Sequence, residues 1–406
     1  MNGSRTARPA FLIAGFCLAL VLNLTGFMTL AAVLPQLMAE WALTGGEAGW
    51  LGGIYFAGYV AAVPVLTSLT DRFDARRICL ASSLVAAIAS LAFAATADGF
   101  WPALIWRFLA GAGLGGTYMP GLKALTDRLP APAQGRAVTY YSAVFALGTA
   151  LSFLTGGEIA EAVGWHWSFV AAGAGCVLGS LIVAILARPV APDRQDAAPG
   201  MVRGFRNVLK NREAMAYIVA FFGYAWEVFA FRVWIVAFIV YAQANSGTDD
   251  FFLSPTGLAT LFALAGVFAN FGFGELTLAR NRRTVLMTVS ILSAVAAVTV
   301  GIANDIAYAP LIALCFVFAM LASGRNAPTT AGSVAAAAHG ARGTTMAVHA
   351  TIGYAGGIVG PLAVGIALDL AGGIGTATGW IAAFCTMAAG AVISFLALLA
   401  IPRRKQ

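Results

Sequence analysis

The sequence has 406 residues, of which 60% are hydrophobic and only 10% are Asp, Glu, Lys or Arg, and its mean hydropathy is +0.85. About a quarter of the residues of a soluble domain are charged, so this composition excludes a soluble globular protein and predicts a polytopic membrane protein. The net charge of +7 does not indicate nucleic-acid binding, because the basic residues follow the order of the apolar runs.

Twelve apolar runs long enough to cross a bilayer follow one another along the chain. The first, 11–37, is too long for a signal-peptide core, so we expect it to remain as a helix. The others are 47–70, 78–97, 101–125, 137–160, 167–187, 214–241, 255–277, 285–303, 306–335, 344–370 and 378–401. The sequence therefore predicts an all-α membrane protein with an N-terminal six-helix bundle at 1–188, a linker at 189–213 and a C-terminal six-helix bundle at 214–406.

The connections between the runs alternate in charge. Of the 24 Lys and Arg residues, 21 lie in the termini and the even-numbered connections. The odd-numbered connections contain no Lys or Arg, and the charged residues at them are Asp and Glu. By the positive-inside rule, both termini and the linker are cytoplasmic, and we expect a bacterial-type inner membrane. The remaining three, Arg107, Arg232 and Arg325, fall within the apolar runs.

The second part of the linker has the pattern of an amphipathic helix. Val202, Phe205, Val208 and Leu209 share one helical face, and basic residues surround it. Such a helix is expected to lie on the anionic inner leaflet of the membrane. A regulatory or partner-binding role is the alternative.

The two halves repeat each other at a constant offset of 208 residues. Gly and Pro coincide in five pairs: Gly116 and Gly324, Pro120 and Pro328, Gly135 and Gly343, Gly148 and Gly356, and Gly157 and Gly365. Parallel repeats of six spans are typical of alternating-access transporters, whose site lies between the halves near the midplane of the membrane.

The connection after the second run contains an acidic and basic motif, TSLTDRFDARR at 67–77, and the second half has a counterpart at 272–283. The motif resembles the loop G-x-L-x-D-R-x-G-R-R of the major facilitator superfamily, with Thr67, Asp74 and Ala75 replacing two glycines and a basic residue. The resemblance covers the whole chain and implies twelve helices in two pseudo-symmetric bundles. It also implies a conformational latch, in which acids cap helix ends and pair with loop arginines in one access state. The latch residues are Asp71, Arg72, Arg76, Glu275, Arg280 and Arg282.

Two more motifs resemble patterns of the same family. Arg107, in the fourth run, begins an R-x-x-x-G motif, and it either snorkels toward the outer face or takes part in proton coupling or anion contact. In the fifth run, 148–157 resembles the antiporter motif G-x-x-x-G-P-x-x-G-G, but Ser152 and Phe153 replace its Gly-Pro pair. This departure weakens the interpretation as a drug exporter. Both the fifth and the eleventh run present glycine faces for helix packing.

The seventh run holds two charges far from its ends. Within 221–238, FFGYAWEVFAFRVWIVAF, Glu227 and Arg232 are five residues apart, which is about 140° of rotation on a helix. They therefore do not pair with each other, and we expect each to meet a group on another helix. A charge in the membrane core costs about 2.5–3.5 kcal/mol and usually has a function, so these residues predict part of a transport pathway.

The tenth run contains Arg325 and Asn326 just before Pro328. A proline frees a backbone carbonyl near the midplane, where transporters often build their sites, so Arg325 is a substrate-binding candidate, with capping of the freed carbonyls as the alternative. The coupling candidates are His349 and Glu227, either of which could carry a coupling proton, and Arg107. The other substrate-binding candidates are Arg232, Asn326, Asn23, Tyr55, Tyr59, Tyr118, Tyr140, Asn270 and Tyr354.

The sequence contains no nucleotide-binding loop, metal-ligand cluster or nucleophile with its base, and its five cysteines are isolated. We therefore expect a secondary transporter, not an enzyme, without a cofactor and monomeric. Because arginines outnumber acids within the spans, the substrate is expected to be a small organic or inorganic anion, taken up by proton symport or anion exchange. A proton-coupled exporter of drugs or metabolites is the alternative.

Overall fold

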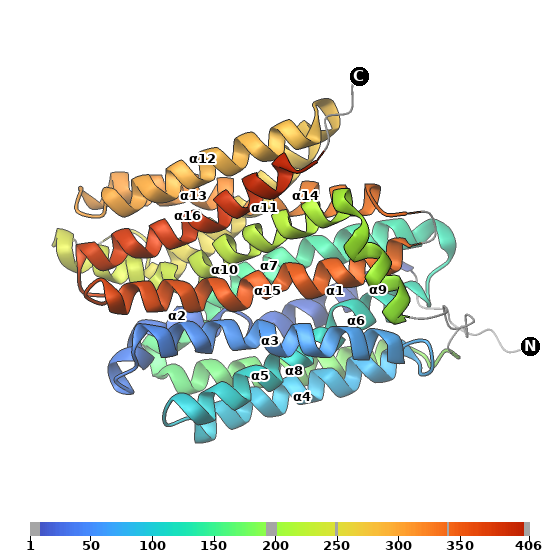
Figure 1. The fold of residues 1–406 in the computed structure, drawn as a ribbon. Helices are drawn as coiled ribbons and strands as arrows, with labels where there is room; N and C mark the ends of the chain where they lie inside the picture. The colour runs from blue at the N-terminus through green and yellow to red at the C-terminus, as the bar shows by residue number, and fades with distance from the viewer. Residues whose placement is uncertain (1–8, 192–200, 248–250, 339–340, 402–406) are drawn as a thin grey trace, which may run out of the picture. The chain divides into compact units, whose positions relative to one another are not determined.

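The computed structural model describes residues 9–191, 201–247, 251–338 and 341–401, and this part of the chain forms sixteen α-helices and no strand (Figure 1). The helices are α1 (Pro9–Leu24), α2 (Thr29–Glu40), α3 (Gly45–Leu69), α4 (Ala75–Thr96), α5 (Phe100–Thr117), α6 (Met119–Thr126), α7 (Ala131–Val163), α8 (Trp165–Leu186), α9 (Met201–Lys210), α10 (Arg212–Ser246), α11 (Pro255–Ala279), α12 (Arg282–Ile302), α13 (Tyr308–Ser323), α14 (Asn326–Ala335), α15 (Arg342–Leu370) and α16 (Ala377–Leu399). The extreme termini and residues 192–200 of the predicted linker lie outside the described residues.

The predicted all-α membrane class is confirmed. Eleven helical stretches among the described residues are long and apolar enough to cross a membrane, and each matches a predicted run. The twelfth predicted run, at 101–125, is present as α5 followed by α6. Several helices begin with a side-chain cap of the expected kind, since Asn211, Ser254, Asn281 and Thr376 each accept a hydrogen bond from a backbone N–H of the first turn.

Three of the predicted runs are interrupted. The first is broken between α1 and α2, the fourth at Tyr118 between α5 and α6, and the tenth at Gly324 and Arg325 between α13 and α14. The second and third breaks lie within two residues of matching positions in the 208-residue repeat, each shortly before its proline, Pro120 or Pro328. Since a break leaves backbone groups without helical partners, polar side chains have to satisfy them.

The chain divides into two compact units. The described residues of Met1–Thr29 and Ala57–Ala197 form the first unit, and those of Leu30–Phe56 and Ala198–Gln406 form the second. Residues 30–56, which the sequence analysis places in the first bundle, thus belong to the second unit here. The predicted boundary of the N-terminal bundle at residue 188 stays a prediction.

Helix α10 is the central element of the second unit. In its most apolar 18 residues, 83% of the side chains are buried, against 39–56% in the other ten stretches. Glycines of α15 allow this close packing: an added Cβ at Gly356 or Gly360 would collide with the backbone carbonyls of Phe222 and Trp226 on α10. The glycine face predicted in the eleventh run is therefore the surface on which α10 and α15 meet.

Residues 30–56 pack on α15 in the same way. A Cβ at Gly49 or Gly53 would collide with backbone atoms of Pro361 or Ile358. Asp369, near the end of α15, accepts hydrogen bonds from the backbone N–H groups of Gly45 (2.7 Å) and Gly46 (2.8 Å) at the start of α3. A carboxylate at a helix N-terminus is a favourable arrangement for both hydrogen bonding and the helix dipole.

The linker contains a helix, α9, as predicted, but part of its apolar face is covered by protein. Val208 is buried and packs with Phe205 against Ile218 of α10 and Val348 of α15. Leu209 is 52% exposed. The side chain of Val202 lies outside the described residues. Among the described side chains of this face, Leu209 is the one exposed, and that the face rests on lipid stays a prediction.

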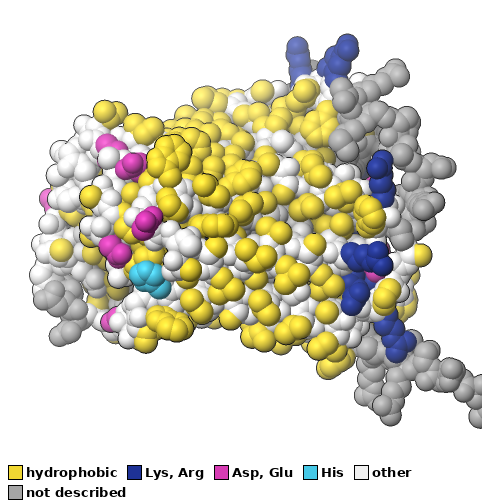
Figure 2. All heavy atoms as spheres, turned by 90° about the horizontal axis from the view of Figure 1, so that it is seen from below, with side chains coloured by type: hydrophobic (Ala, Val, Ile, Leu, Met, Phe, Trp, Pro, Cys, Tyr) yellow, Lys and Arg dark blue, Asp and Glu magenta, His cyan; other side chains and the backbone are white. Residues whose placement is uncertain are grey.

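Basic and acidic side chains gather at opposite ends of the face seen in Figure 2. In the first unit, Arg72, Arg77 and Arg136 lie near the helix ends at one side of the spans, and Asp98 and Glu161 lie near the ends at the other side. We call these the basic end and the acidic end. Helix ends of the second unit follow the same pattern, with Arg212, Arg280 and Arg342 at its basic end and Asp305 and Asp369 at its acidic end.

Candidate functional site

A buried ion pair joins α10 to the break between α13 and α14. Arg325 donates through Nη2 to Glu227 Oε2, and the two residues are 1% and 0% exposed. Two serines of α12 complete the cluster: Ser293 Oγ donates to Glu227 Oε1 at 2.8 Å, and Arg325 Nη1 donates to Ser290 Oγ at 3.2 Å. Glu227 thus meets a group on another helix, as predicted, and its charge neutralises that of Arg325.

Arg325 nevertheless has a donor to spare. Its Nε is buried without a hydrogen-bond partner among the described residues. Its neighbour Asn326 is partly exposed and its side chain hydrogen-bonds to that of Tyr224 on α10. Asn270, on α11, accepts a hydrogen bond from the Ala327 N–H at 2.9 Å, so this candidate supports the interrupted helix. Whether Arg325 binds substrate stays a prediction.

Arg232 has a different environment from Arg325. It lies five residues beyond Glu227, is partly exposed, and has no ion pair among the described residues of the second unit. Its guanidinium carbon lies over the ring of Phe229, 5.5 Å from the centroid. Arg232 also lies close enough to Tyr224 and Tyr354 to interact with them electrostatically. The sequence-predicted candidates Arg232 and Tyr354 therefore lie near each other, and Tyr224 is close to both Arg232 and Arg325.

His349 is a residue of α15, and its ring contacts α14. Its Nδ1 is 2.9 Å from Ser333 Oγ and its Nε2 is 3.4 Å from Thr330 Oγ1, and its ring packs on Phe221 with centroids 4.2 Å apart. In the 208-residue repeat His349 corresponds to Tyr141, whose hydroxyl donates to the Thr117 carbonyl at 3.0 Å beside the first-half break. Tyr141 thus connects α7 to the interrupted span α5–α6, and His349 connects α15 to the interrupted span α13–α14.

Arg107 is buried in the first unit, 4% exposed, instead of extending toward the acidic end. It donates to the carbonyls of Gly26 (3.2 Å) and Phe27 (3.5 Å), which lie in the break between α1 and α2. The same break is supported by Ser152, whose Oγ accepts the Met28 N–H at 3.0 Å. Ser152 replaces a glycine of the family motif, and no sequence pattern indicates this contact.

The remaining first-half candidates differ in their surroundings. Asn23 donates to the Ala19 carbonyl at 2.8 Å, and its Oδ1 is buried without a partner among the described residues. Tyr118 stacks on Tyr141 with centroids 6.0 Å apart. Tyr140 is 56% exposed, whereas Tyr141 is 2% exposed, so of these two adjacent tyrosines the buried one reaches the break. Tyr55 and Tyr59 are both buried.

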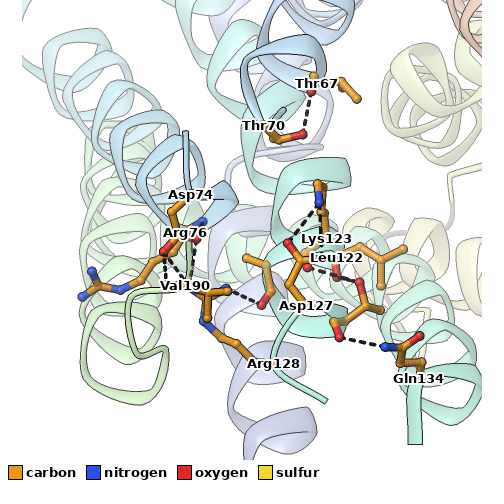
Figure 3. A network of polar contacts seen from close by, with 12 residues as sticks. Thr67, Thr70, Asp74, Arg76, Leu122, Lys123, Asp127, Arg128, Gln134 and Val190 are labelled. Carbon is orange, nitrogen blue, oxygen red and sulfur yellow. Dashed lines mark hydrogen bonds and ion pairs between the residues drawn. The ribbon is translucent and has the colours of Figure 1, made fainter. Parts of the chain in front are cut away.

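At the basic end of the first unit, Asp74 is the centre of a polar network (Figure 3). Arg128 Nη2 donates to both carboxylate oxygens of Asp74 at 2.8 Å, and the N–H groups of Arg76 and Val190 donate to the same carboxylate at 2.9 Å. Burial by itself would raise the pKa of Asp74, but the hydrogen bonds from Arg128, Val190 and Arg76 outweigh it and hold the pKa below its usual value.

Of the predicted latch residues, Arg76 takes part in this network through its backbone N–H. Asp71 and Glu275 are exposed, and neither forms an ion pair among the described residues. Arg76 donates to the Ala184 carbonyl at the end of α8, and in the second unit Arg283 donates to the Leu398 carbonyl near the end of α16. Arg72 and Arg280 are exposed, and Arg282 has a buried Nε without a partner in the described part of the chain. The latch itself stays a prediction.

Two helical units with charged groups inside their apolar spans are typical of a membrane transporter. The family description "Major Facilitator Superfamily" matches residues 16–361, and the chain belongs to this family. It is therefore a secondary transporter and not an enzyme, as the sequence indicated.

Relatives in sequence are distant. The niacin transporter NiaP of Acinetobacter baylyi is 28% identical over 144 residues, which are 36% of this chain and 33% of NiaP. Protein spinster homolog 1 of Homo sapiens is 21% identical over 257 residues, 61% of this chain and 49% of the relative. The matched part of this chain thus spans a third to a half of the length of these relatives.

The fold is shared with solved structures along almost its whole length. A bacterial homolog of the human lysosomal transporter Spinster, in an inward-facing and unoccupied conformation, has a TM-score of 0.75 at 16% identity and covers 98% of both chains. The nucleoside transporter NupG has a TM-score of 0.74 at 15% identity and covers 98% of this chain and 99% of its own. At these identities the similarity demonstrates the fold alone.

Proposed function

We propose that the protein takes up a small anion through the membrane, with Arg232 as the residue that binds it, by proton symport or anion exchange. The observation that carries this proposal is the difference between the two arginines of the second unit. Arg325 is neutralised by Glu227, whereas Arg232 is partly exposed and has no carboxylate partner among the described residues of that unit. An anionic substrate supplies the missing countercharge.

Energetics support this assignment. Arg232 lies 20 residues from the start of the 35-residue helix α10, in its middle third, where an unpaired charge is costly. A carboxylate or phosphate bound by the planar guanidinium forms two parallel charge-assisted hydrogen bonds, which offset that cost and give directional specificity. The names of two relatives support an anionic substrate. Niacin, named for NiaP, is a carboxylic acid. A relative of Mus musculus that is 23% identical over 246 residues is named as a transporter of sphingosine-1-phosphate, which carries a phosphate group.

Coupling to protons is assigned to Glu227. When Glu227 takes up a proton, Arg325 loses its countercharge, so the second unit gains a positive charge and attracts an anion more strongly. By thermodynamic linkage, a bound anion then favours protonation of Glu227 by the same factor. Such mutual reinforcement is what proton–anion symport requires. We place the basic ends in the cytoplasm and the protein, as a monomer, in a bacterial-type inner membrane.

A proton-coupled exporter of drugs is the second candidate. It is favoured by the aromatic side chains around Arg232 and by the similarity to Multidrug resistance protein 3 of Bacillus subtilis, which is 24% identical over 167 residues. The damaged antiporter motif, with Ser152 bound to the break in the first span, argues against it.

The test is uptake of radiolabelled niacin, other monocarboxylates and inorganic phosphate into proteoliposomes, with and without an inward proton gradient, together with counterflow. Arg232→Lys keeps the charge but loses the planar fork, so affinity for the transported anion should fall about tenfold, and Arg232→Gln should reduce it further. Arg136→Gln, at an exposed arginine of the basic end, is the matched control and should transport normally. Accumulation of none of these anions, with export of a cationic dye that Arg232→Gln leaves intact, would replace the anion proposal by the exporter.

A further inference from the structure

Arg232, which is partly exposed, lies over the ring of Phe229, one of a line of aromatic rings in the second unit. Phe56 packs on Phe229 with centroids 4.1 Å apart, Phe229 lies 6.2 Å from Tyr354, and Tyr354 lies 5.3 Å from Phe221. Within this line, Phe56, Phe229 and Phe221 are at most 5% exposed, while Tyr354 is partly exposed like Arg232. The two partly exposed residues here are thus one arginine and one aromatic residue.

We propose that the transported anion is an aromatic carboxylate, whose carboxylate binds the N–H edge of Arg232 and whose ring lies against Tyr354. The inference rests on the proposed function and narrows its substrate class. It is carried by the position of Arg232 over Phe229, together with the ring of Tyr354 beside it.

Geometry favours a flat ligand in this place. A carboxylate attached directly to an aromatic ring lies in the plane of that ring, and a fork-like guanidinium–carboxylate pair is also planar. An aromatic carboxylate bound by Arg232 is therefore coplanar with the guanidinium group, and both faces of its ring are free to stack. Neighbouring rings pack on such a face or edge at centroid distances of 4.5–7 Å, which is the spacing that already separates Phe229, Tyr354 and Phe221.

A saturated ring lacks both advantages. Cyclohexanecarboxylate has the same number of carbon atoms as benzoate and the same charge at pH 7, but its ring is puckered and has no π faces. Its apolar surface is at least as large, so hydrophobic burial alone would make it the equal or the better ligand. Aromatic pairing beyond burial predicts instead that benzoate binds about three- to tenfold more tightly.

The experiment compares these two probes on the full-length purified protein in nanodiscs, by isothermal titration calorimetry. The wild type should bind benzoate at least threefold more tightly than cyclohexanecarboxylate. Tyr354→Leu should bring this ratio close to one by weakening benzoate alone, and Tyr354→Phe, which keeps the ring, should preserve the ratio. Arg232→Gln should weaken both probes equally.

The outcomes separate the inference from the function on which it rests. Equal binding of the two probes by the wild type, lost in Arg232→Gln, overturns the aromatic preference and leaves the anion proposal intact. A benzoate preference that survives in Tyr354→Leu also overturns the inference, because the ring that carries it would be elsewhere. If neither probe binds, the inference fails, and the anion proposal is then decided by the uptake of phosphate and the other anions. If the probes bind and Arg232→Gln leaves their binding unchanged, both the inference and the assignment of Arg232 as the anion-binding residue fail.

Discussion

Glu227 and Arg325 neutralise each other inside the second unit, 98 residues apart in sequence and both almost inaccessible. A buried pair of this kind adds little stability compared with apolar residues, but removal of one partner leaves an uncompensated charge and costs about 3–5 kcal/mol. Ser293 hydrogen-bonds to Glu227 and Ser290 to Arg325, but a neutral hydroxyl would not replace a lost countercharge.

The first prediction concerns stability. Glu227→Gln and Arg325→Gln should each lower the free energy of unfolding by about 3–5 kcal/mol, and the double variant should recover most of that loss. Thermal unfolding of the purified variants in one detergent measures this double-mutant cycle. Losses that simply add in the double variant would show that the two side chains do not interact.

The second prediction concerns coupling. In Glu227→Gln, residue 227 is permanently neutral, so proton-driven uptake should fall more strongly than substrate exchange, which needs no change in protonation. Proteoliposome uptake with a pH gradient, alongside counterflow, separates the two activities. Glu161→Gln, at an exposed acid of the acidic end, is the control and should leave both unchanged. Equal losses in uptake and exchange would remove Glu227 from the coupling step.

Hydropathy was sufficient to predict the all-α membrane class, because a bilayer requires long apolar helices and leaves few alternatives. The prediction of two six-helix bundles needed the 208-residue repeat and the resemblance to the family motifs as well. For the site, the sequence was enough to name the charged and polar candidate residues, but not to say which of them contact each other. The 140° between Glu227 and Arg232 excluded a pair along one helix, but no local pattern pointed from Glu227 to Arg325, since helix packing decides that contact. Tyr140 and Tyr141 illustrate the same limit, because a rotation of about 100° per residue separates an exposed ring from a buried one.

Asp74 was missed for a different reason. The family motif has a glycine at this position, so the acid counted as a departure from the pattern and Asp71 took its role. The structure shows a buried carboxylate that binds Arg128 and two backbone N–H groups. The available signal was an acid two residues before Arg76 at the start of a helix, which is the pattern of an N-cap.

The third prediction separates these two acids. Asp74→Ala should destabilise the protein by about 2–4 kcal/mol, because Arg128 loses its partner and hydrogen bonds to a charged group are lost. Since the pKa of Asp74 is lowered in the folded state, its contribution is complete above the unfolded pKa of about 3.9 and is lost as the pH falls through the lower, folded value. Thermal unfolding between pH 7 and pH 3 should therefore show a smaller decrease in Asp74→Ala than in the wild type.

Asp71→Asn and Glu275→Gln provide the comparison. Both residues are exposed and without an ion pair in the described residues, so their replacement should change the free energy of unfolding by less than about 0.5 kcal/mol. If they act as latches, transport should slow while the affinity for substrate stays nearly constant, because a latch acts on the equilibrium between access states. A large loss of affinity at normal maximal flux would contradict that role.

The fourth prediction tests the support of the first-span break. Ser152→Ala removes the acceptor of the buried Met28 N–H and should cost about 1–3 kcal/mol of stability. Thr139→Ala, on the exposed side of the same helix α7, removes a hydroxyl that donates to the Gly135 carbonyl of its own helix and should cost much less. Equal thermal shifts for the two variants would mean that the hydrogen bond from Met28 to Ser152 contributes nothing.

The last prediction concerns the attachment of residues 30–56 to α15. Asp369 holds the start of α3 through the N–H groups of Gly45 and Gly46, and Asn at this position keeps only one acceptor oxygen and no charge for the helix dipole. In Asp369→Asn, residues 30–56 should therefore separate from α15 more often.

Ala48, which is 0% exposed, reports this opening when it is changed to Cys in a Cys385→Ala background, since the other four cysteines are buried. The rate of maleimide labelling at position 48 should rise about five- to thirtyfold, which corresponds to the loss of about 1–2 kcal/mol. Asp305→Asn, at an exposed acid of the same end, is the control and should leave the rate unchanged, and an unchanged rate in Asp369→Asn would show that the glycine contacts alone hold residues 30–56 in place.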